Sequence, residues 1–275
     1  MFLVFFPKEK ATTGMKIIFS LLLLLPATLL AQSPFDGTWI AKLDMAQLPK
    51  RPEVYMLHNG TYECPSCLPK IKVDADGKDH PIAGSPYFST VCIRVVDNNS
   101  IQLTERQDGK VVYSETDSVS PGGDTLQQII VDSAAPAGQP VTAEETYKRV
   151  GPGPAGSNAI SGSWQAQRVN VTSENGITVT YRSTPGGLEA SNPGGEGYDA
   201  KFDGKEYPIH GDPVHSTVSL KRISDNTIVE TDKQDGGVHY RLRLAVSPDG
   251  KSMKVIETDS ERGTTMTYIM KKKSQ

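Results

Sequence analysis

DGKDHPIAGSPYFSTVCIRVVDNNSIQLTERQDGKVVYSETDSVSP, residues 76–121, decides the fold because the chain repeats it as DGKEYPIHGDPVHSTVSLKRISDNTIVETDKQDGGVHYRLRLAVSP, residues 203–248. The two stretches align without a gap at an offset of 127, and 21 of 46 positions are identical. The shared residues are mainly turn formers, with strand-forming residues between them. A fixed internal period of this length indicates two tandem copies of one structural unit.

Each copy opens with a glycine and one of the two tryptophans of the chain, in FDGTW at 35–39 and ISGSW at 160–164. The alternation of residues after each tryptophan is typical of a half-buried first strand. Further runs, separated by Asp-Gly, Asp-Asn and Asn-Asn turns, predict eight or nine antiparallel strands in each copy. Closure of such a meander removes its exposed edges. The sequence therefore predicts an all-β protein of two tandem antiparallel up-and-down barrels.

The beginning of the chain has the pattern of a secretory signal peptide. Lys16 precedes the apolar run Ile17–Leu25, and Ala31 offers a small residue at which cleavage can occur. This predicts a periplasmic or secreted bacterial protein with no membrane span after cleavage. The expected boundaries are a signal peptide at 1–31, a first barrel at 32–150, a Gly/Pro linker at 151–158 and a second barrel at 159–275.

Gly37 and Trp39, Gly162 and Trp164, and the meander that follows each pair resemble the lipocalin and fatty-acid-binding (calycin) architecture. More closely, the chain after the signal peptide resembles an uncharacterised family of exported bacterial tandem-repeat proteins. The phrases that carry this resemblance are YECPSCLPKIKVDADGKD at 62–79, VVYSETDSVSP at 111–121, ISGSWQAQRV at 160–169 and VSPDGKSM at 246–253. The resemblance implies lipocalin-like units in both copies and implies no particular activity.

Two of the three cysteines, Cys64 and Cys67, are separated by two residues. In an exported protein such thiols form a disulfide with each other or bind a metal together with two further ligands. A redox-active pair would need Cys64 at a helix N-terminus, whereas the flanking residues favour a strand and then a loop. We expect a structural disulfide, with redox work and metal carriage as the alternatives. Cys92 stands where the second copy has Ser219, which predicts a buried, inert thiol.

Several classes of function are disfavoured by composition and motifs. The net charge is −3, and neither copy is basic, so we expect no nucleic-acid partner. The sequence has no G-x-S-x-G or H-E-x-x-H motif, and we expect no catalytic residues and no enzymatic activity. His210, His215 and His239 could bind a metal only if folding brought them together, and the first copy lacks them. We therefore expect no metal and no cofactor.

The second copy contains a candidate site for a small ligand. If Leu220 faces the interior, Arg222 does so too, and Tyr240 and Leu242 share one face of a later strand. A cation and a tyrosine among aliphatic residues could receive the carboxylate of an apolar ligand. The first hypothesis is therefore a non-enzymatic binding protein for a small apolar or amphipathic ligand. The alternatives are a structural or cell-surface interaction module with filled barrels and a CxxC redox or metal-carrier protein. The sequence identifies no protein partner.

Overall fold

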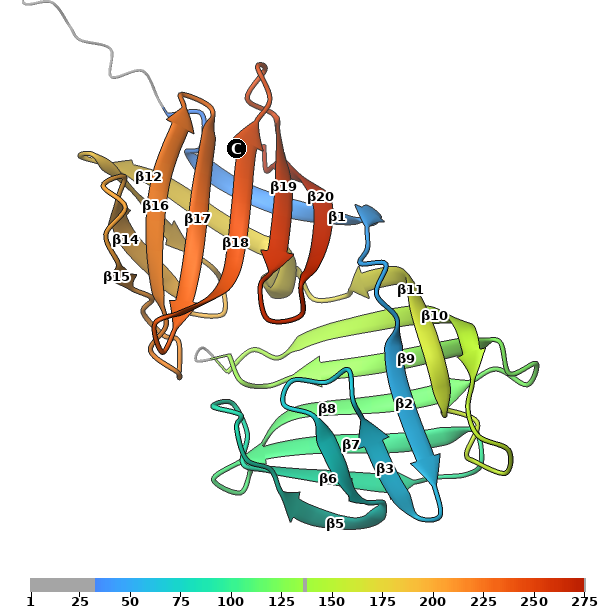
Figure 1. Ribbon diagram of the computed structural model, residues 1–275. Coiled ribbons are helices and arrows are strands. Elements are labelled where there is room, and N and C mark those ends of the chain that lie inside the picture. The colour runs from blue at the N-terminus through green and yellow to red at the C-terminus, as the bar shows by residue number, and fades with distance from the viewer. Residues whose placement is uncertain (1–32, 136–137, 275) are drawn as a thin grey trace, which may run out of the picture. The chain divides into compact units, whose positions relative to one another are not determined.

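The computed structural model describes residues 33–135 and 138–274, so the expected signal peptide at 1–31 lies outside the described residues. Within that part the chain forms β1 to β20 and one short 3-10 turn, η1 (Glu174–Ile177) (Figure 1). The prediction of an all-β, antiparallel protein is confirmed. In the described residues no helix is long and apolar enough to span a membrane.

The first sheet has the strand order β4-β3-β2-β11-β10-β9-β8-β7-β6-β5. Its strands are β2 (Glu53–His58), β3 (Thr61–Cys64), β4 (Ile71–Asp74), β5 (Asp76–Pro81), β6 (Thr90–Val95), β7 (Ser100–Gln107), β8 (Lys110–Val119), β9 (Thr125–Asp132), β10 (Val141–Pro152) and β11 (Gly162–Val171).

The second sheet has the order β14-β13-β12-β1-β20-β19-β18-β17-β16-β15. Its strands are β1 (Gly37–Gln47), β12 (Thr178–Thr184), β13 (Gly187–Ser191), β14 (Gly197–Lys201), β15 (Tyr207–Pro208), β16 (Thr217–Ser224), β17 (Thr227–Gln234), β18 (Gly237–Val246), β19 (Ser252–Asp259) and β20 (Thr264–Lys272).

Each sheet is a nearly closed, barrel-like antiparallel sheet of ten strands rather than the expected eight or nine. The strand missed in the first copy is β5, most of whose residues are exposed, so it carries no period-two signal. Its pairing with β6 is irregular between Asp76 and Asp79, where Gly77 has a φ of 76°. A turn-rich sequence therefore forms an extra edge strand, and β15 is its two-residue counterpart in the second sheet.

The two copies exchange their first strands. β1, from the first copy, lies between β12 and β20, while β11, from the second copy, lies between β2 and β10. Figure 1 shows β1 in blue among strands drawn in orange and red. Strand pairing thus differs from the expectation that each copy pairs only within itself. The sheets are connected covalently through 48–52 and 172–177.

Both exchanged strands are anchored in the same way. Trp39 and Trp164 are fully buried, and each indole nitrogen donates a hydrogen bond to a carbonyl oxygen four residues earlier, over 2.7 and 2.8 Å. A cation covers each ring, with the Lys272 ammonium 5.1 Å and the Arg149 guanidinium 4.0 Å from the ring centroids. Gly162 precedes β11's tryptophan with a φ of 142°, and a Cβ there would lie 2.5 Å from a carbonyl oxygen. The Gly-x-Trp signature is therefore a steric requirement of strand entry.

Residues 151–158, expected to be a linker, belong to the β10–β11 hairpin. Gly151 and Pro152 are the end of β10 and pair with Ser163 and Gly162. The hairpin loop is held at its far end, because the Asn158 amide donates to the carbonyl of Leu57 on β2. This segment therefore closes the first sheet.

Candidate functional site

The interior of the first sheet contains a cavity of about 400 Å³. Its lining is unusually polar for the inside of a small barrel, because tyrosine and glutamate side chains predominate over aliphatic ones. The lining residues with aromatic or ionisable side chains are Glu53, Tyr55, Tyr62, Tyr87, Phe88, Glu105, Tyr113, Glu115, Glu145, Tyr147 and Arg262. A barrel of this size can be filled by side chains or hold one small ligand, and here room remains.

The polar lining results from the alternation of side chains between the two faces of β8. Tyr113, Glu115 and Asp117 alternate along this strand and so share the inner face. Across the ladder, Glu105 of β7 pairs with Tyr113, and Gln128 of β9 pairs with Asp117. Three neighbouring strands thereby place polar side chains on one interior face, at successive levels of the ladder, and these side chains are called the polar layer below.

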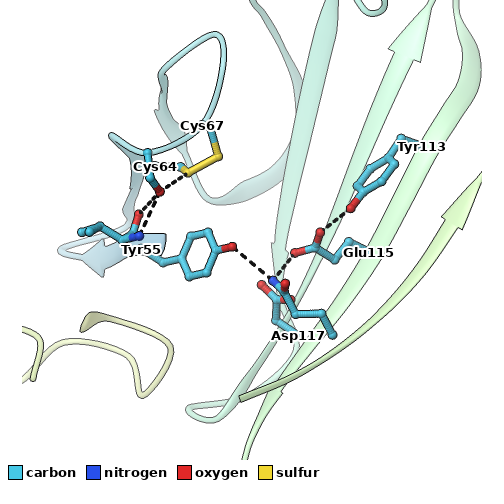
Figure 2. Close-up of a disulfide and its surroundings, with 9 residues drawn as sticks. Tyr55, Cys64, Cys67, Tyr113, Glu115 and Asp117 are labelled. Atoms are coloured by element: carbon cyan, nitrogen blue, oxygen red, sulfur yellow. Dashed lines mark hydrogen bonds between the residues drawn. A yellow bond between two sulfur atoms is a disulfide. The ribbon is translucent and has the colours of Figure 1, made fainter. Parts of the chain in front are cut away.

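A single amide group connects the two carboxyl groups of β8, as Figure 2 shows. Gln128 Nε2 donates to Glu115 Oε1 at 2.7 Å and to Asp117 Oδ1 at 2.9 Å, and it lies 3.4 Å from the Tyr55 hydroxyl. The Tyr113 hydroxyl donates to the other oxygen of Glu115 over 2.5 Å. Asp117 is 1% exposed, and its Oδ2 atom is buried with no hydrogen-bond partner. The layer therefore contains more acceptors than donors.

Burial dominates the electrostatics of this layer, because charged carboxylates are poorly solvated there. It raises the pKa of Glu115 well above the ordinary value, with the charge of Asp117 adding to the effect. It also raises the pKa of Asp117, and it raises that of Glu105 to about 8. The pKa of Glu145 is raised by burial too, although the Tyr147 hydroxyl and the charge of Arg262 act in the opposite direction. With a pKa of about 8, Glu105 is largely protonated near neutral pH in the unliganded protein.

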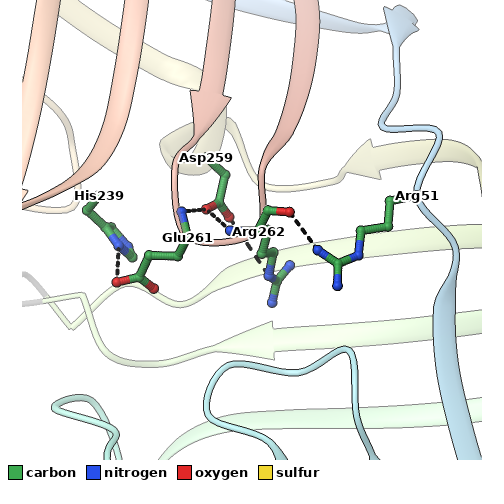
Figure 3. Close-up of polar contacts among 5 residues, drawn as sticks. All are labelled: Arg51, His239, Asp259, Glu261 and Arg262. Carbon is green, nitrogen blue, oxygen red and sulfur yellow. Dashed lines mark hydrogen bonds and ion pairs between the residues drawn. The ribbon is translucent and has the colours of Figure 1, made fainter.

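Arg262, the basic residue in the cavity lining, belongs to the β19–β20 turn, drawn in Figure 3. Asp259 organises this turn, since its Oδ1 accepts hydrogen bonds from the backbone amides of Glu261 and Arg262 at 3.0 and 2.9 Å. The Arg262 carbonyl accepts a hydrogen bond from Arg51 at 2.7 Å. His239 Nδ1 lies 3.4 Å from a carboxylate oxygen of Glu261 but has no hydrogen-bond partner.

The second sheet has a smaller cavity of about 190 Å³ with related chemistry. Its lining includes Tyr181, Tyr198, Glu230 and Asp232, and the Tyr198 hydroxyl donates to Glu230 at 2.5 Å. Burial raises the pKa of Glu230 to about 7 and that of Asp232 to about 8. Buried carboxyl groups paired with tyrosines are thus common to both sheets. A further cavity of about 480 Å³ is lined mainly by residues of the second sheet, including Leu242, Leu244 and Tyr268, so the first sheet differs in the polarity of its cavity rather than in its volume.

The structure does not bring together the residues predicted to receive a ligand carboxylate. Leu220 is fully buried in the core of the second sheet, but Arg222 is exposed near the end of β16, with its guanidinium 4.4 Å from the Phe202 ring. Along the ladder Arg222 pairs with Ile228, whereas Tyr240 pairs with Asp232. Arg222 and Tyr240 therefore lie towards opposite ends of the sheet. Leu242 is half-buried against the apolar core.

The predicted disulfide between Cys64 and Cys67 is confirmed, with a Cα–Cα distance of 5.4 Å. Cys64 is fully buried at the end of β3, and no helix begins there. The Ser66 hydroxyl accepts a hydrogen bond from the backbone amide of Val54 on β2 at 2.9 Å, which fixes the loop against the sheet. Because Cys67 lines the large cavity, the disulfide supports one part of the cavity wall. The thiol of Cys92 is free and half-buried, and burial raises its pKa.

The three histidines considered as metal ligands serve in separate local structures. His210 forms an isolated backbone bridge with Gly197, and His215 lies in a turn with a φ of 57°. Among the described residues no group of three or more His, Cys, Asp or Glu side chains has the geometry to hold a metal ion.

The polar layer of β8 was missed by sequence reasoning, although the internal repeat carried a signal for it. Glu115 and Asp117 occupy the positions of Leu242 and Leu244 in the second copy. Leu244 is 1% exposed, so the two carboxyl residues stand at interior positions of the shared scaffold. An acidic residue at a core position of a repeat is the pattern that would have identified the site. Compared with models of known families and with curated proteins, the sequence matches none.

Proposed function

We propose that the protein is a non-enzymatic binding protein, exported to the periplasm or secreted, that holds one small amphipathic ligand inside the first sheet. The observation that carries this proposal is the cavity of about 400 Å³, which is lined by aromatic rings and by a layer of hydrogen-bonding groups. Apolar walls with a few convergent polar groups are typical of small-molecule sites. The sequence-based hypothesis of an amphipathic ligand is kept, but its location moves from the second copy to the first sheet.

Binding is a better account of these residues than catalysis. The carboxyl groups of the cavity are raised in pKa, as catalytic acids often are, but the described lining includes no histidine, serine or cysteine thiol that could form a nucleophile–base pair. Cys67 is oxidised in the disulfide. The same groups are well suited to fixing the polar end of a ligand, while the tyrosine rings contact its apolar part.

The proposal is tested by filling the cavity. N-phenyl-1-naphthylamine, an uncharged dye that fluoresces in apolar surroundings, serves as the probe, and native mass spectrometry of protein from its own host seeks a retained molecule. Ile130→Trp places a large ring in the cavity, because Ile130 lines it. Ile129→Trp is the matched control, since Ile129 is the next residue of β9 and its side chain is 51% exposed.

We expect the dye to bind wild-type protein and the Ile129→Trp variant equally well, and Ile130→Trp to abolish binding. If wild-type protein binds no dye and retains no small molecule, the interaction module with side-chain-filled barrels becomes the better interpretation.

A further inference from the structure

We propose that the ligand of the first-sheet cavity is an organic cation, an alkylammonium-type molecule whose charged end lies against Glu115. This inference rests on the proposed binding function and assigns the chemical class of the ligand. Four observations carry it: the charge balance of the lining, the shortage of hydrogen-bond donors around Glu115 and Asp117, the aromatic walls and the absence of metal-binding geometry in the described residues.

The charge balance of the cavity favours a cation. Glu53, Glu105, Glu115 and Glu145 line the space, and Arg262 is the basic side chain among the lining residues. Isolated buried carboxylates are costly, and a bound positive charge compensates them. An anionic ligand would add to this excess of negative charge. With a neutral ligand, the carboxyl groups would either stay protonated or carry negative charges without a counter-charge.

The hydrogen-bond balance points the same way. Glu115 and Asp117 share the single amide nitrogen of Gln128, and Asp117 Oδ2 has no partner although the residue is 1% exposed. Carboxylates only accept hydrogen bonds, while an ammonium group offers up to three donors and no acceptor. Asp117 is not among the lining residues, so the N–H groups of a cation would contact Glu115, whose oxygens each accept only one hydrogen bond from the protein.

The remaining walls fit the apolar part of such a molecule. Tyr55, Tyr62 and Tyr147 line the cavity and are each less than a tenth exposed, so their rings are held in place by packing. Aromatic faces attract cations, and their rings also bury alkyl chains. A bare metal ion has no use for these walls, and the described residues contain no cluster with metal-binding geometry.

Binding of a cation should release protons. The titratable and charged groups that act on Glu115 and Asp117 or on their neighbours are Glu53 and Tyr55 of β2, Tyr62 of β3, Glu105 of β7, Tyr113 of β8, Asp132 of β9, Glu145 and Tyr147 of β10, and Arg262 of the β19–β20 turn. Burial raises the pKa of Glu105 to about 8 in the free protein. A bound cation favours the ionised carboxylates, so affinity should increase as pH rises towards that value.

Octylamine, octan-1-ol and octanoate test the inference, because they share one alkyl chain and differ in the charge of the polar end. Each is titrated against the purified protein by displacement of N-phenyl-1-naphthylamine, with calcium chloride as a metal-ion probe. Calorimetry in two buffers of different ionisation enthalpy counts the protons released. Glu115→Gln is the test variant, and Asp232→Asn, which changes a buried carboxyl of the second sheet, is the control.

We expect wild-type protein to bind octylamine about 10- to 100-fold more tightly than octan-1-ol, as one charge-assisted hydrogen bond would give. Octanoate should bind most weakly, and octylamine affinity should increase from about pH 6 to about pH 8, where the amine stays protonated. Glu115→Gln should bring octylamine and octan-1-ol to similar affinity while dye binding persists, which shows that the variant is folded. Asp232→Asn should change nothing.

The inference is overturned if the alcohol or the acid displaces the dye as well as the amine does, if Glu115→Gln keeps the preference, or if calcium binds in place of the amine. In those cases the binding function stands. If wild-type protein neither binds the dye nor retains a small molecule, the binding function fails together with the inference.

Discussion

Replacing Trp39 with alanine is expected to destabilise the second sheet, although Trp39 belongs to the first copy of the repeat. The side chain is fully buried and its indole nitrogen donates to the Phe35 carbonyl at 2.7 Å. Removing a buried tryptophan costs about 3–5 kcal/mol. Because each 1.4 kcal/mol is a factor of ten, the loss corresponds to roughly a hundredfold to a few thousandfold in the opening equilibrium.

Native-state hydrogen exchange locates this loss. In Trp39→Ala, amides of β16 to β19 should exchange faster by that factor, whereas amides of β7 to β9 should change much less. Trp164→Ala is the matched control, since Trp164 is equally buried and donates at 2.8 Å within the first sheet. It should give the inverse pattern. Faster exchange of β7 to β9 in Trp39→Ala would refute the strand exchange and place each tryptophan in its own copy.

A pair of cysteines gives an independent readout. Thr38 pairs with Thr180 in the second sheet, with their hydroxyl oxygens 2.9 Å apart, while Ser163 pairs with Val54 at the equivalent place in the first sheet. Thr38→Cys with Thr180→Cys should therefore form a disulfide in monomeric protein. Thr38→Cys with Val54→Cys should not, because that pair would meet only if the strands were not exchanged. Replacing Cys92 with serine removes the competing thiol from both variants.

The disulfide prediction is checked by thiol labelling of denatured, unreduced protein, which should find Cys92 as the one free thiol. Replacing Cys64 and Cys67 with serine should lower the free energy of unfolding by at most about 2 kcal/mol, because the loop that the disulfide closes is short. Burial raises the pKa of Asp232 to about 8, so the folded state holds a proton that the unfolded chain releases above about pH 4. Stability in urea should fall between about pH 4 and about pH 8, and Asp232→Asn should flatten that slope; a rise with pH would contradict the reasoning. Arg149→Met removes a guanidinium that donates to three carbonyl oxygens, and it should cost about 1.5–3 kcal/mol in the same assay, with Arg149→Lys intermediate.

The tandem repeat, the antiparallel strands and the disulfide could be predicted because each has a local signature in turn residues, period-two alternation or cysteine spacing. Strand exchange could not, because Trp39 and Trp164 head equivalent strands with equivalent patterns, and either strand fits either sheet. Which pairing forms depends on how 48–52 and 172–177 run between the sheets, and alternation along a strand contains no information on that.

The predicted site residues show a second limit of periodicity. Alternation correctly places Leu220 in the core, and extending it by two residues puts Arg222 inside as well. In the structure the last four residues of β16 are exposed, so the strand runs beyond the core before it ends. A sequence pattern shows which face a residue takes but not where the packed interior stops.

Strand exchange also determines when each sheet can be completed during synthesis of the chain. The first sheet needs β11 and can close once residue 171 has been made. β1 can pair with β12 once residue 184 has been made, but its other edge must wait for β20, since Ala41 pairs with Met270. One edge of β1 thus stays unpaired until nearly the whole chain has been made. Such distant pairings slow folding and leave an apolar strand open to wrong partners in the meantime. We therefore expect truncation before β20 to leave the first sheet folded and β1 available for intermolecular pairing.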